Sequence, residues 1–345
     1  MNLGYLRPLR DRPGPWASAY LDASTDTADA RKRIDLGARA VAEQLTEAGA
    51  DSATRDAVAA AIRDHTGTGR HGLAAFAAGG QVLHTQPFAE PPTQPKAVWG
   101  SLPSLLPLLV GSGEQVRWLR VLVDRTGGDL VLDTGQTLRT VRGGDRYPIH
   151  KAQPGGWSQP RYQRAAETNW ERNAKDVAEA IARAVDEAGA DVIVLAGDVR
   201  ARQLIGEHLP VAVTERVVET EAGSRAAGAD PEPLDEATEQ AVQALVERRH
   251  EQVLDAYRAG LAHGLAVAGL SALRTPLEWG QVETLLLHPD VPGETADGLI
   301  WAAVGQDAEV MLVAPEQERL PEGMGAVLRF RVTAPEGGPD NAALA

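Results

Sequence analysis

The residues best suited to chemistry lie at positions 154–164, which read Pro-Gly-Gly-Trp-Ser-Gln-Pro-Arg-Tyr-Gln-Arg. Gly155 and Gly156 can take positive φ and let a ligand or another backbone approach closely. Apolar residues then recur at helical spacing over positions 162–185. We therefore expect an outward-reaching loop at the N-terminus of a long helix, which buries one face and ends near Gly189.

Positive charge gathers around this loop, although the whole chain carries a net charge of -14. The free N–H groups at a helix start add partial positive charge, so the region suits a phosphate-rich partner such as RNA. Residues 146–175 contain two acidic residues, Glu167 and Glu171, and six basic ones: Arg146, Lys151, Arg161, Arg164, Arg172 and Lys175. The residues expected to contact RNA are Lys151, Gly155, Gly156, Trp157, Ser158, Gln159, Arg161 and Arg164.

The pattern Gly-Gly-x-Ser-x-x-Arg-aromatic-x-Arg, followed by a long helix, resembles the central domain of eukaryotic and archaeal class-1 release factors and their bacterial relatives. In that family the loop is Gly-Gly-Gln and enters the ribosomal peptidyl-transferase centre. Here Trp157 stands where the resemblance places the catalytic glutamine. The departure therefore falls on the residue that carries the family's chemistry.

Peptide release needs a group that positions water and a donor that stabilises the oxyanion. A glutamine amide offers an acceptor and donors, whereas the Trp157 indole offers one donor and no acceptor. Gln153 or Gln159 would have to replace it from two or more residues away, by another geometry. We therefore expect no peptide release. An exposed Trp157 can instead stack on an unpaired RNA base, and the alternative, that it folds back onto its own domain, stays open.

A second resemblance covers residues 264–286 and 325–330, which are similar to the C-terminal domain of release factors and Pelota. Together the two resemblances span residues of about 116–332. This segment most resembles the bacterial and archaeal branch to which the ribosome-hibernation factor Balon belongs. In that family the C-terminal domain contacts a translational GTPase, EF-Tu in bacteria. The resemblance implies a contact surface at Trp279, Gly280, Gln281 and Glu283.

These features predict a ribosome-binding translation factor that occupies the A site without peptide release, as a hibernation or stress factor with no cofactor. The N-terminal domain lies outside the resemblance and has no codon-reading motif. The alternatives are a peptidyl-tRNA hydrolase or a release or rescue factor with a non-standard loop, a nuclease, and an interaction protein unrelated to ribosomes. A nuclease would need converging carboxylates, and the nearest candidates, Asp124, Asp129 and Asp133, are expected on solvated turns.

The composition is that of a globular protein, with 345 residues, 43% apolar and 24% charged. The chain has no cysteine, no run of 18 uncharged apolar residues and no apolar signal-peptide core near Met1, so we expect a cytosolic protein without membrane contact. A sequence pI of about 5.1 does not suit a general nucleic-acid coat, so DNA is not an expected partner and any RNA contact must be local.

The fold class expected is α/β, of the α+β kind, with mixed sheets covered by helices in a three-domain, release-factor-like arrangement. The domains are 1–112, 113–230 with the loop, and 231–335, before a tail at 336–345. We expect Asp198 to cap a helix rather than to bind a metal or nucleotide, and a long helix at 236–268 to change partner near 248–250. The main expected strands are 16–22, 71–78, 81–88, 116–123, 137–142, 191–197, 282–287, 310–313 and 327–332.

Overall fold

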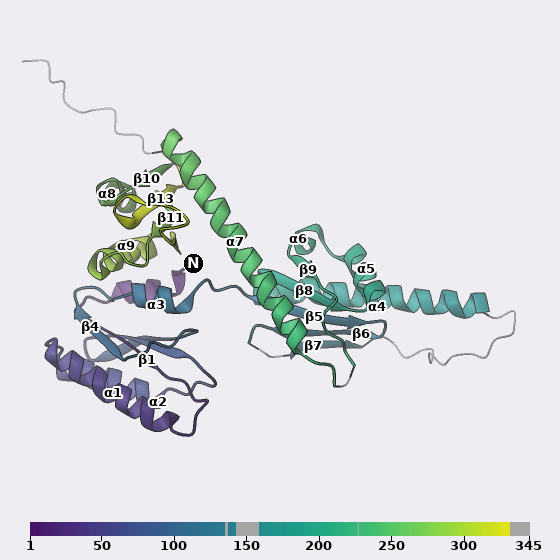
Figure 1. Cartoon of the computed structure of the whole chain (residues 1–345), viewed down its shortest axis with the longest axis horizontal. Helices are drawn as coiled ribbons and strands as arrows, with labels where there is room; N and C mark the ends of the chain where they lie inside the picture. Colours follow the sequence, from purple (N-terminus) through teal and green to yellow (C-terminus); the bar gives the residue numbers. More distant parts are fainter. Residues whose placement is uncertain (135–136, 143–158, 227, 332–345) are drawn as a thin grey trace, which may run out of the picture. The chain divides into compact units, whose positions relative to one another are not determined.

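The computed structural model describes residues 1–134, 137–142, 159–226 and 228–331. The chain divides into two compact units, the first formed by Met1–Gln115 with His250–Ala345 and the second by Val116–Arg249. Both combine β-sheets with covering helices, so the mixed α/β class predicted from the sequence is confirmed (Figure 1). The division into three domains stays a prediction.

The N-terminal part of the first unit holds an antiparallel sheet with the strand order β3-β2-β1-β4. Its strands are β1 (Trp16–Asp22), β2 (Gly72–Ala78), β3 (Gln81–Phe88) and β4 (Lys96–Gly100). Gly79 and Gly80 make the β2–β3 turn with φ of 59° and 77°, a conformation that glycine adopts without a steric cost. The strands predicted at 71–78 and 81–88 therefore form a hairpin.

Both faces of this sheet are covered, because alternate residues of a strand point to opposite faces. Small side chains such as Ala17 and Ala19 pack with α1 and α2, while Trp16, Tyr20 and Phe76 belong to a second core on the other face. The covering helices are α1 (Ala30–Glu47), α2 (Ser52–Asp64), the 3-10 helix η1 (Gly4–Asp11) and α3 (Leu106–Ser112). The sheet is therefore an inner layer of the first unit.

The C-terminal part of the first unit holds a second sheet, with the strand order β10-β13-β11-β12. Its elements are β10 (Ala266–Ala268), α8 (Leu270–Glu278), β11 (Val282–Leu287), α9 (Gly293–Gly305), β12 (Glu309–Leu312) and β13 (Met324–Leu328). Two expectations were wrong here. Residues 266–268 form a strand rather than the end of a helix, because Gly264 takes a φ of 69° and ends the helix. The last strand begins at Met324, ahead of the predicted 327–332.

One hydrophobic core joins the two sheets of the first unit through helix α9. The Trp16 and Trp301 rings meet edge to face at 6.0 Å, and the Arg10 guanidinium lies over Trp301 at 5.2 Å. The buried Asp297 carboxylate of α9 accepts hydrogen bonds from the backbone N–H groups of Leu105 at 2.6 Å and Leu106 at 3.0 Å. Asp297 thus caps α3, which has no capping side chain of its own.

The second unit contains a five-stranded sheet with the order β7-β6-β5-β8-β9. Its strands are β5 (Trp118–Asp124), β6 (Gly127–Leu132), β7 (Thr137–Arg142), β8 (Val192–Gly197) and β9 (Val217–Glu219). Strands β5, β6 and β7 form an antiparallel meander, and β8 and β9 continue in parallel from β5. The strand predicted at 191–197 is confirmed.

Helices cover both faces of this sheet (Figure 1). Residues such as Leu119 and Val121 pack against α4 (Gln159–Ala188) and α5 (Val199–His208), and Val192 and Val194 pack against the first half of α7. A four-residue helix, α6 (Val211–Thr214), leads into β9. The sheet is therefore the middle layer of a three-layer unit.

Helix α7 (Glu232–His263) changes partner where the sequence predicted a change. Ala241 and Leu245 belong to the core of the second unit, whereas Leu254 and Tyr257 belong to that of the first. Leu261, expected on the buried stripe, is 48% exposed. In the described part of the chain no helix is long and apolar enough to span a membrane.

Candidate functional site

The loop singled out from the sequence lies largely outside the described residues: Lys151, Gly155, Gly156, Trp157 and Ser158 are not among them. Gln159, Arg161 and Arg164 lie in the first two turns of α4, which begins at Gln159, directly after the loop. The helix ends with Gly189, whose φ is 65° and whose N–H donates to the Val185 carbonyl at 2.8 Å. The predicted helix is confirmed, while RNA contact by these residues stays a prediction.

The C-terminal half of α4 holds the helix against the sheet. Ala174, Val177 and Ile181 are at most 5% exposed and belong to the core with β5 and β8. Gly128 of β6 lets the helix come close, because a Cβ at this position would lie 3.2 Å from Val177. The described side chains before Ala174 are half-buried or exposed. The packed half of α4 therefore anchors a helix whose first half lies outside the core.

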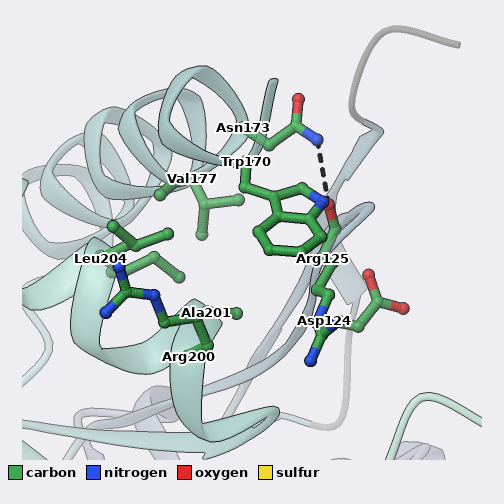
Figure 2. Close-up of a pocket in the computed structure, with 10 residues that line it drawn as sticks. Asp124, Arg125, Trp170, Asn173, Val177, Arg200, Ala201 and Leu204 are labelled. Carbon is green, nitrogen blue, oxygen red and sulfur yellow. Dashed lines mark hydrogen bonds between the residues drawn. The ribbon is translucent and has the colours of Figure 1, made fainter. Parts of the chain in front are cut away.

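A hollow of about 280 Å³, part of it open to solvent, lies between α4 and α5 at the end of β5 (Figure 2). Trp170 and Val177 line it from α4, and Arg200 and Leu204 line it from α5. Trp170 was expected only as part of the buried stripe of α4, but its side chain is half-buried and forms one wall. Helical spacing alone does not separate a core tryptophan from one at the edge of the core.

Arg125, the residue after β5, is fixed at the same place. Its guanidinium lies over the Trp170 ring at 4.7 Å from the centroid, and its Nε lies 3.3 Å from Asp198 Oδ2. Its carbonyl accepts a hydrogen bond from Asn173 Nδ2 at 3.1 Å, drawn dashed in Figure 2. The Trp170 ring lies between Arg125 and the α5 side chains, so Arg125 packs on the face of the indole opposite the hollow.

Asp198 does what the sequence predicted at the turn from β8 to α5. Its carboxylate accepts a hydrogen bond from the Ala201 N–H at 3.0 Å and so caps α5. Gly197 takes a φ of 108°, and a Cβ there would lie 2.0 Å from the Val123 carbonyl oxygen. Across the residues that the structure describes, no group of three or more His, Asp or Glu side chains is placed to hold a metal ion.

The carboxylates considered for a nuclease are partly buried in ion pairs. Arg225 bonds Asp124 through Nη1 at 2.8 Å and Asp129 through Nε at 2.8 Å, and its side chain is only 15% exposed. Burial alone would raise the pKa of Asp124, but hydrogen bonds from Thr126 and the charge of Arg225 outweigh it and hold that pKa below its usual range. Asp133 is exposed. The expectation of simple solvated turns was wrong for Asp124 and Asp129, because Arg225 comes from a distant segment.

The residues predicted to contact a GTPase differ in exposure. Trp279 is 51% exposed and Glu283 is exposed, whereas Gln281 is 4% exposed and its side chain is not presented to a partner. The Arg329 N–H donates to the Gln281 carbonyl at 2.8 Å, so the segment that contains Phe330, 52% exposed, runs beside that of Gln281. Sequence reasoning missed Phe330, since the pattern placed it in a buried strand.

The middle of the chain is similar to a known protein family. Residues 117–263 match the model of bacterial archaeo-eukaryotic release factor family 2. This match supports a release-factor-like class for the part of the chain that contains the loop and α4, as the loop pattern predicted. It ends at position 263, so the resemblance of the C-terminal segment and of the Balon branch stays a prediction.

The chain is also similar to two uncharacterized proteins of Mycobacterium tuberculosis, from strains CDC 1551 / Oshkosh and H37Rv. Each is 29% identical over 364 residues, with 95% of this chain and 96% of the relative covered. Among solved structures, it is similar to the archaeal translation termination factor aRF1 at 19% identity, with 94% of this chain and 96% of that chain covered and a TM-score of 0.28. It is also similar to archaeal Pelota, from a model of ribosome-bound Pelota and ABCE1, at 17% identity. That comparison covers 76% of this chain and 78% of the Pelota chain, with a TM-score of 0.46. Because these TM-scores are below 0.5, the class rests on the family match.

Proposed function

We propose that this chain is a ribosome-associated translation factor that occupies the A site without releasing the nascent peptide, as a hibernation or stress factor. One observation carries the proposal. The release-factor family match spans the loop and α4, yet Trp157 stands where the resemblance places the catalytic glutamine. The parts of the loop used for insertion, Gly155, Gly156, Ser158 and Arg161, are retained, and the group used for hydrolysis is not.

The loss of glutamine bears on catalysis rather than on placement. Hydrolysis of peptidyl-tRNA needs an acceptor that orients water toward the ester carbonyl, and the indole of Trp157 has none. A planar indole does bind well to unpaired bases, with about 1 to 3 kcal/mol per stacked base. Tryptophan in place of glutamine at position 157 therefore removes a catalytic group and adds one that favours binding in the ribosomal A site.

The N-terminal sheet supports binding that ignores the message. One of its faces is covered by α1 and α2, and the other belongs to the core that reaches α9. The central strands β1 and β2 of this sheet are buried on both faces and offer no surface to a codon. A factor that does not read the codon can enter ribosomes that carry any message or none, as hibernation requires.

The surface around Trp279 suits a protein partner, and we propose a translational GTPase such as EF-Tu. Trp279 and Phe330 are each about half exposed, and the Arg329–Gln281 hydrogen bond holds their segments together. Aromatic side chains are enriched where proteins bind one another. The contact set then includes Trp279, Glu283 and Phe330, and excludes the side chain of Gln281.

Ribosome binding tests the proposal through the basic residues of the loop and of α4. Replacement of Lys151, Arg161 and Arg164 together by Ala should weaken co-sedimentation with ribosomes. It should also flatten the salt dependence of binding. The slope of the logarithm of the binding constant against the logarithm of salt concentration should fall by about 0.7 to 0.9 for each phosphate that the variant no longer neutralises. A matched control replaces Arg31, Lys32 and Arg39 of α1, which are also two arginines and one lysine and are all exposed.

The control triple should bind like the wild type with the same salt slope. Equal losses of affinity in both triples would show that net charge, rather than this surface, governs binding. An unchanged affinity and slope in the loop triple would contradict the proposed contact surface.

A further inference from the structure

Two histidines lie at the ends of the connection between α2 and β2, residues 65–71. His65 directly follows α2, and His71 directly precedes β2. Their Nε2 atoms lie 2.9 Å apart, within hydrogen-bond distance, and His71 is 8% exposed. The hydrogen bond therefore ties the two ends of the connection together. We propose that this histidine pair is an acid-sensitive switch, which keeps the α2–β2 connection closed at neutral pH and opens it when both rings are protonated.

The neighbouring groups determine which ring nitrogens carry protons. His71 Nδ1 lies 3.2 Å from the carbonyl oxygen of Gly69, and because that oxygen is an acceptor, we assign the proton of the neutral ring to Nδ1. His71 Nε2 is then the acceptor within the pair, and the Nε2–H group of His65 is the donor. A first added proton can bind His65 Nδ1 and leave this hydrogen bond intact. A second must bind His71 Nε2, which places two N–H groups against each other and breaks the bond.

The connection packs tightly over the pair at Gly67. A Cβ at this position would lie 2.2 Å from His71 Nε2 and 2.7 Å from His65 Nε2. His71 is buried and His65 is half-buried, so water does not fully solvate a second positive charge between the two rings. Because two adjacent like charges also repel, the closed connection disfavours the doubly protonated pair.

The closed connection docks on the neighbouring connection between β1 and α1. The N–H of Ala23 donates to the His71 carbonyl at 3.0 Å, and the N–H of Thr25 donates to the Gly69 carbonyl at 2.9 Å. The His71 N–H in turn donates to the buried Ser24 Oγ at 3.1 Å. Loss of the bond between the histidines should therefore release this docking, while β1 and β2 stay paired along their own ladder.

The carboxylate that faces the pair from β1 does not titrate in the same range. Asp22 interacts electrostatically with His71, and Arg33 of α1 lies 3.3 Å from the Asp22 carboxylate. Burial would raise the pKa of Asp22, but hydrogen bonds from Ser24 and the charges of Arg33 and His71 outweigh it and lower that pKa. Asp22 therefore stays ionised where histidines titrate, near pH of about 6.5, and the histidines are the groups that change charge.

The direction of the pH dependence follows from His65. Burial and then the charge of His71 lower the pKa of His65 in the folded state below its unfolded value of about 6.5. Its contribution to stability is complete above that value and is lost as pH falls through the folded-state pKa. Two further charged residues stand beside the pair, Asp64 at the end of α2 and Arg70 in the connection, and both are exposed to solvent.

Amide hydrogen exchange of the full chain between about pH 7.5 and pH 5, a range that includes the ordinary histidine pKa, tests the switch. Protection is expressed relative to an unfolded chain at the same pH. The N–H groups of Ala23 and Thr25 report the docking, and the N–H of Ala19 in β1, opposite Ala75 of β2, is the internal reference. In the wild type, protection of the two reporters should fall about tenfold per pH unit for one proton taken up on opening. That of Ala19 should stay constant.

Two variants change the pair in opposite directions. His65→Gln provides an amide that can donate to the neutral His71 ring and accept from the protonated one, so protection should stay high at both ends of the pH range. Gly67→Ala places a methyl group against both ring nitrogens, so protection should already be low at neutral pH and change little in acid. His84→Gln is the matched control. It removes another half-buried histidine of the same sheet, whose pKa is also lowered by burial, and should respond to acid as the wild type does.

Reporter protection that does not change with pH in the wild type would overturn the proposal, and so would a normal acid response in His65→Gln. Gly67→Ala retains both histidines, so it tests the pair even if His65→Gln does not fold, and wild-type protection in that variant would also refute the switch. Parallel loss at Ala19 would show that acid unfolds the whole sheet instead. None of these outcomes depends on ribosome binding, so the proposed function is tested separately.

Discussion

The two units of this chain use buried side chains for different ends. In the first unit, two sheets share one core, and polar groups from the C-terminal helix α9 complete the N-terminal part. In the second unit, a single sheet anchors α4, and the surface remains hollowed beside Trp170 with the Arg200 cation at the rim. The difference is one of packing: buried side chains join two sheets in the first unit, whereas in the second unit they hold one long helix on a single sheet.

The contacts within each unit follow the same contrast. Asp297 is 8% exposed, and within the described chain its carboxylate accepts hydrogen bonds from two backbone N–H groups, so we assign it a structural role. Arg225 is 15% exposed and ties a long connection to the β5–β6 turn. Asp297 and Arg225 are single side chains that each hold distant segments of one unit together. A substitution at either residue should therefore lower the stability of its own unit and leave that of the other unchanged.

Removal of the Asp297 carboxylate should have the largest effect on stability. Asp297→Ala leaves the N–H groups of Leu105 and Leu106 without their acceptor, at a cost of about 1 to 3 kcal/mol for each buried donor left unsatisfied. The unfolding transition of the first unit, followed by amide hydrogen exchange of its strands β1 and β11, should move to lower denaturant, while that of the second unit stays in place.

Glu294→Ala is the matched control, since Glu294 is an exposed carboxylate on the same helix. It should cost less than about 1 kcal/mol, as expected for a charge near a helix N-terminus. Asp297→Asn, which keeps an oxygen acceptor, should fall between the two. Equal stability of Asp297→Ala and Glu294→Ala would contradict the capping role.

A smaller effect is expected for Arg225→Ala in the second unit. This change removes one cation from two carboxylates, and hydrogen bonds to charged groups contribute about 1.5 to 3 kcal/mol when buried and less at partial exposure. Only the second unit should lose stability in denaturant titrations. Arg183→Ala, which breaks an exposed pair with Glu179 in the same unit, should change little, and a similar loss of stability in both variants would argue against the Arg225 tie.

The same ion pair predicts a modest pH dependence. The pKa of Asp124 in the folded state lies below its unfolded value of about 3.9, so its contribution is complete above that value and is lost as pH falls through the folded-state pKa. Unfolding of the second unit, measured between about pH 5 and pH 1, should therefore show a smaller acid loss in Arg225→Ala than in the wild type. Parallel curves would show that the pair contributes no pH dependence.

The elements were predictable where a local pattern decides them. Alternation predicted β5, and helical spacing with Gly189 predicted α4, because burial on one face imposes a period on the sequence. The joining of the two sheets of the first unit was not predictable. Asp297 caps Leu105 across 192 residues, and nothing in the pattern around either residue marks the partner.

The candidate site was predictable to the same limited degree. The Gly-Gly loop and the helix start follow from residue types near position 155, but the hollow depends on side chains from three separate elements. Trp170, Arg125 and Arg200 come together only because β5, α4 and α5 pack around one core. A single sequence contains no period that relates them.

The central claim is occupancy of the ribosome without peptide release, and single-turnover release from purified ribosomes carrying labelled peptidyl-tRNA tests it most directly. The wild type should bind and release no peptide above the background without factor, and Trp157→Gln should bind equally well and gain release if Gly155 and Gly156 still place residue 157. Efficient release by the wild type would contradict the claim. It would favour a release or rescue factor with a non-standard loop, in which Gln159 is the nearest amide.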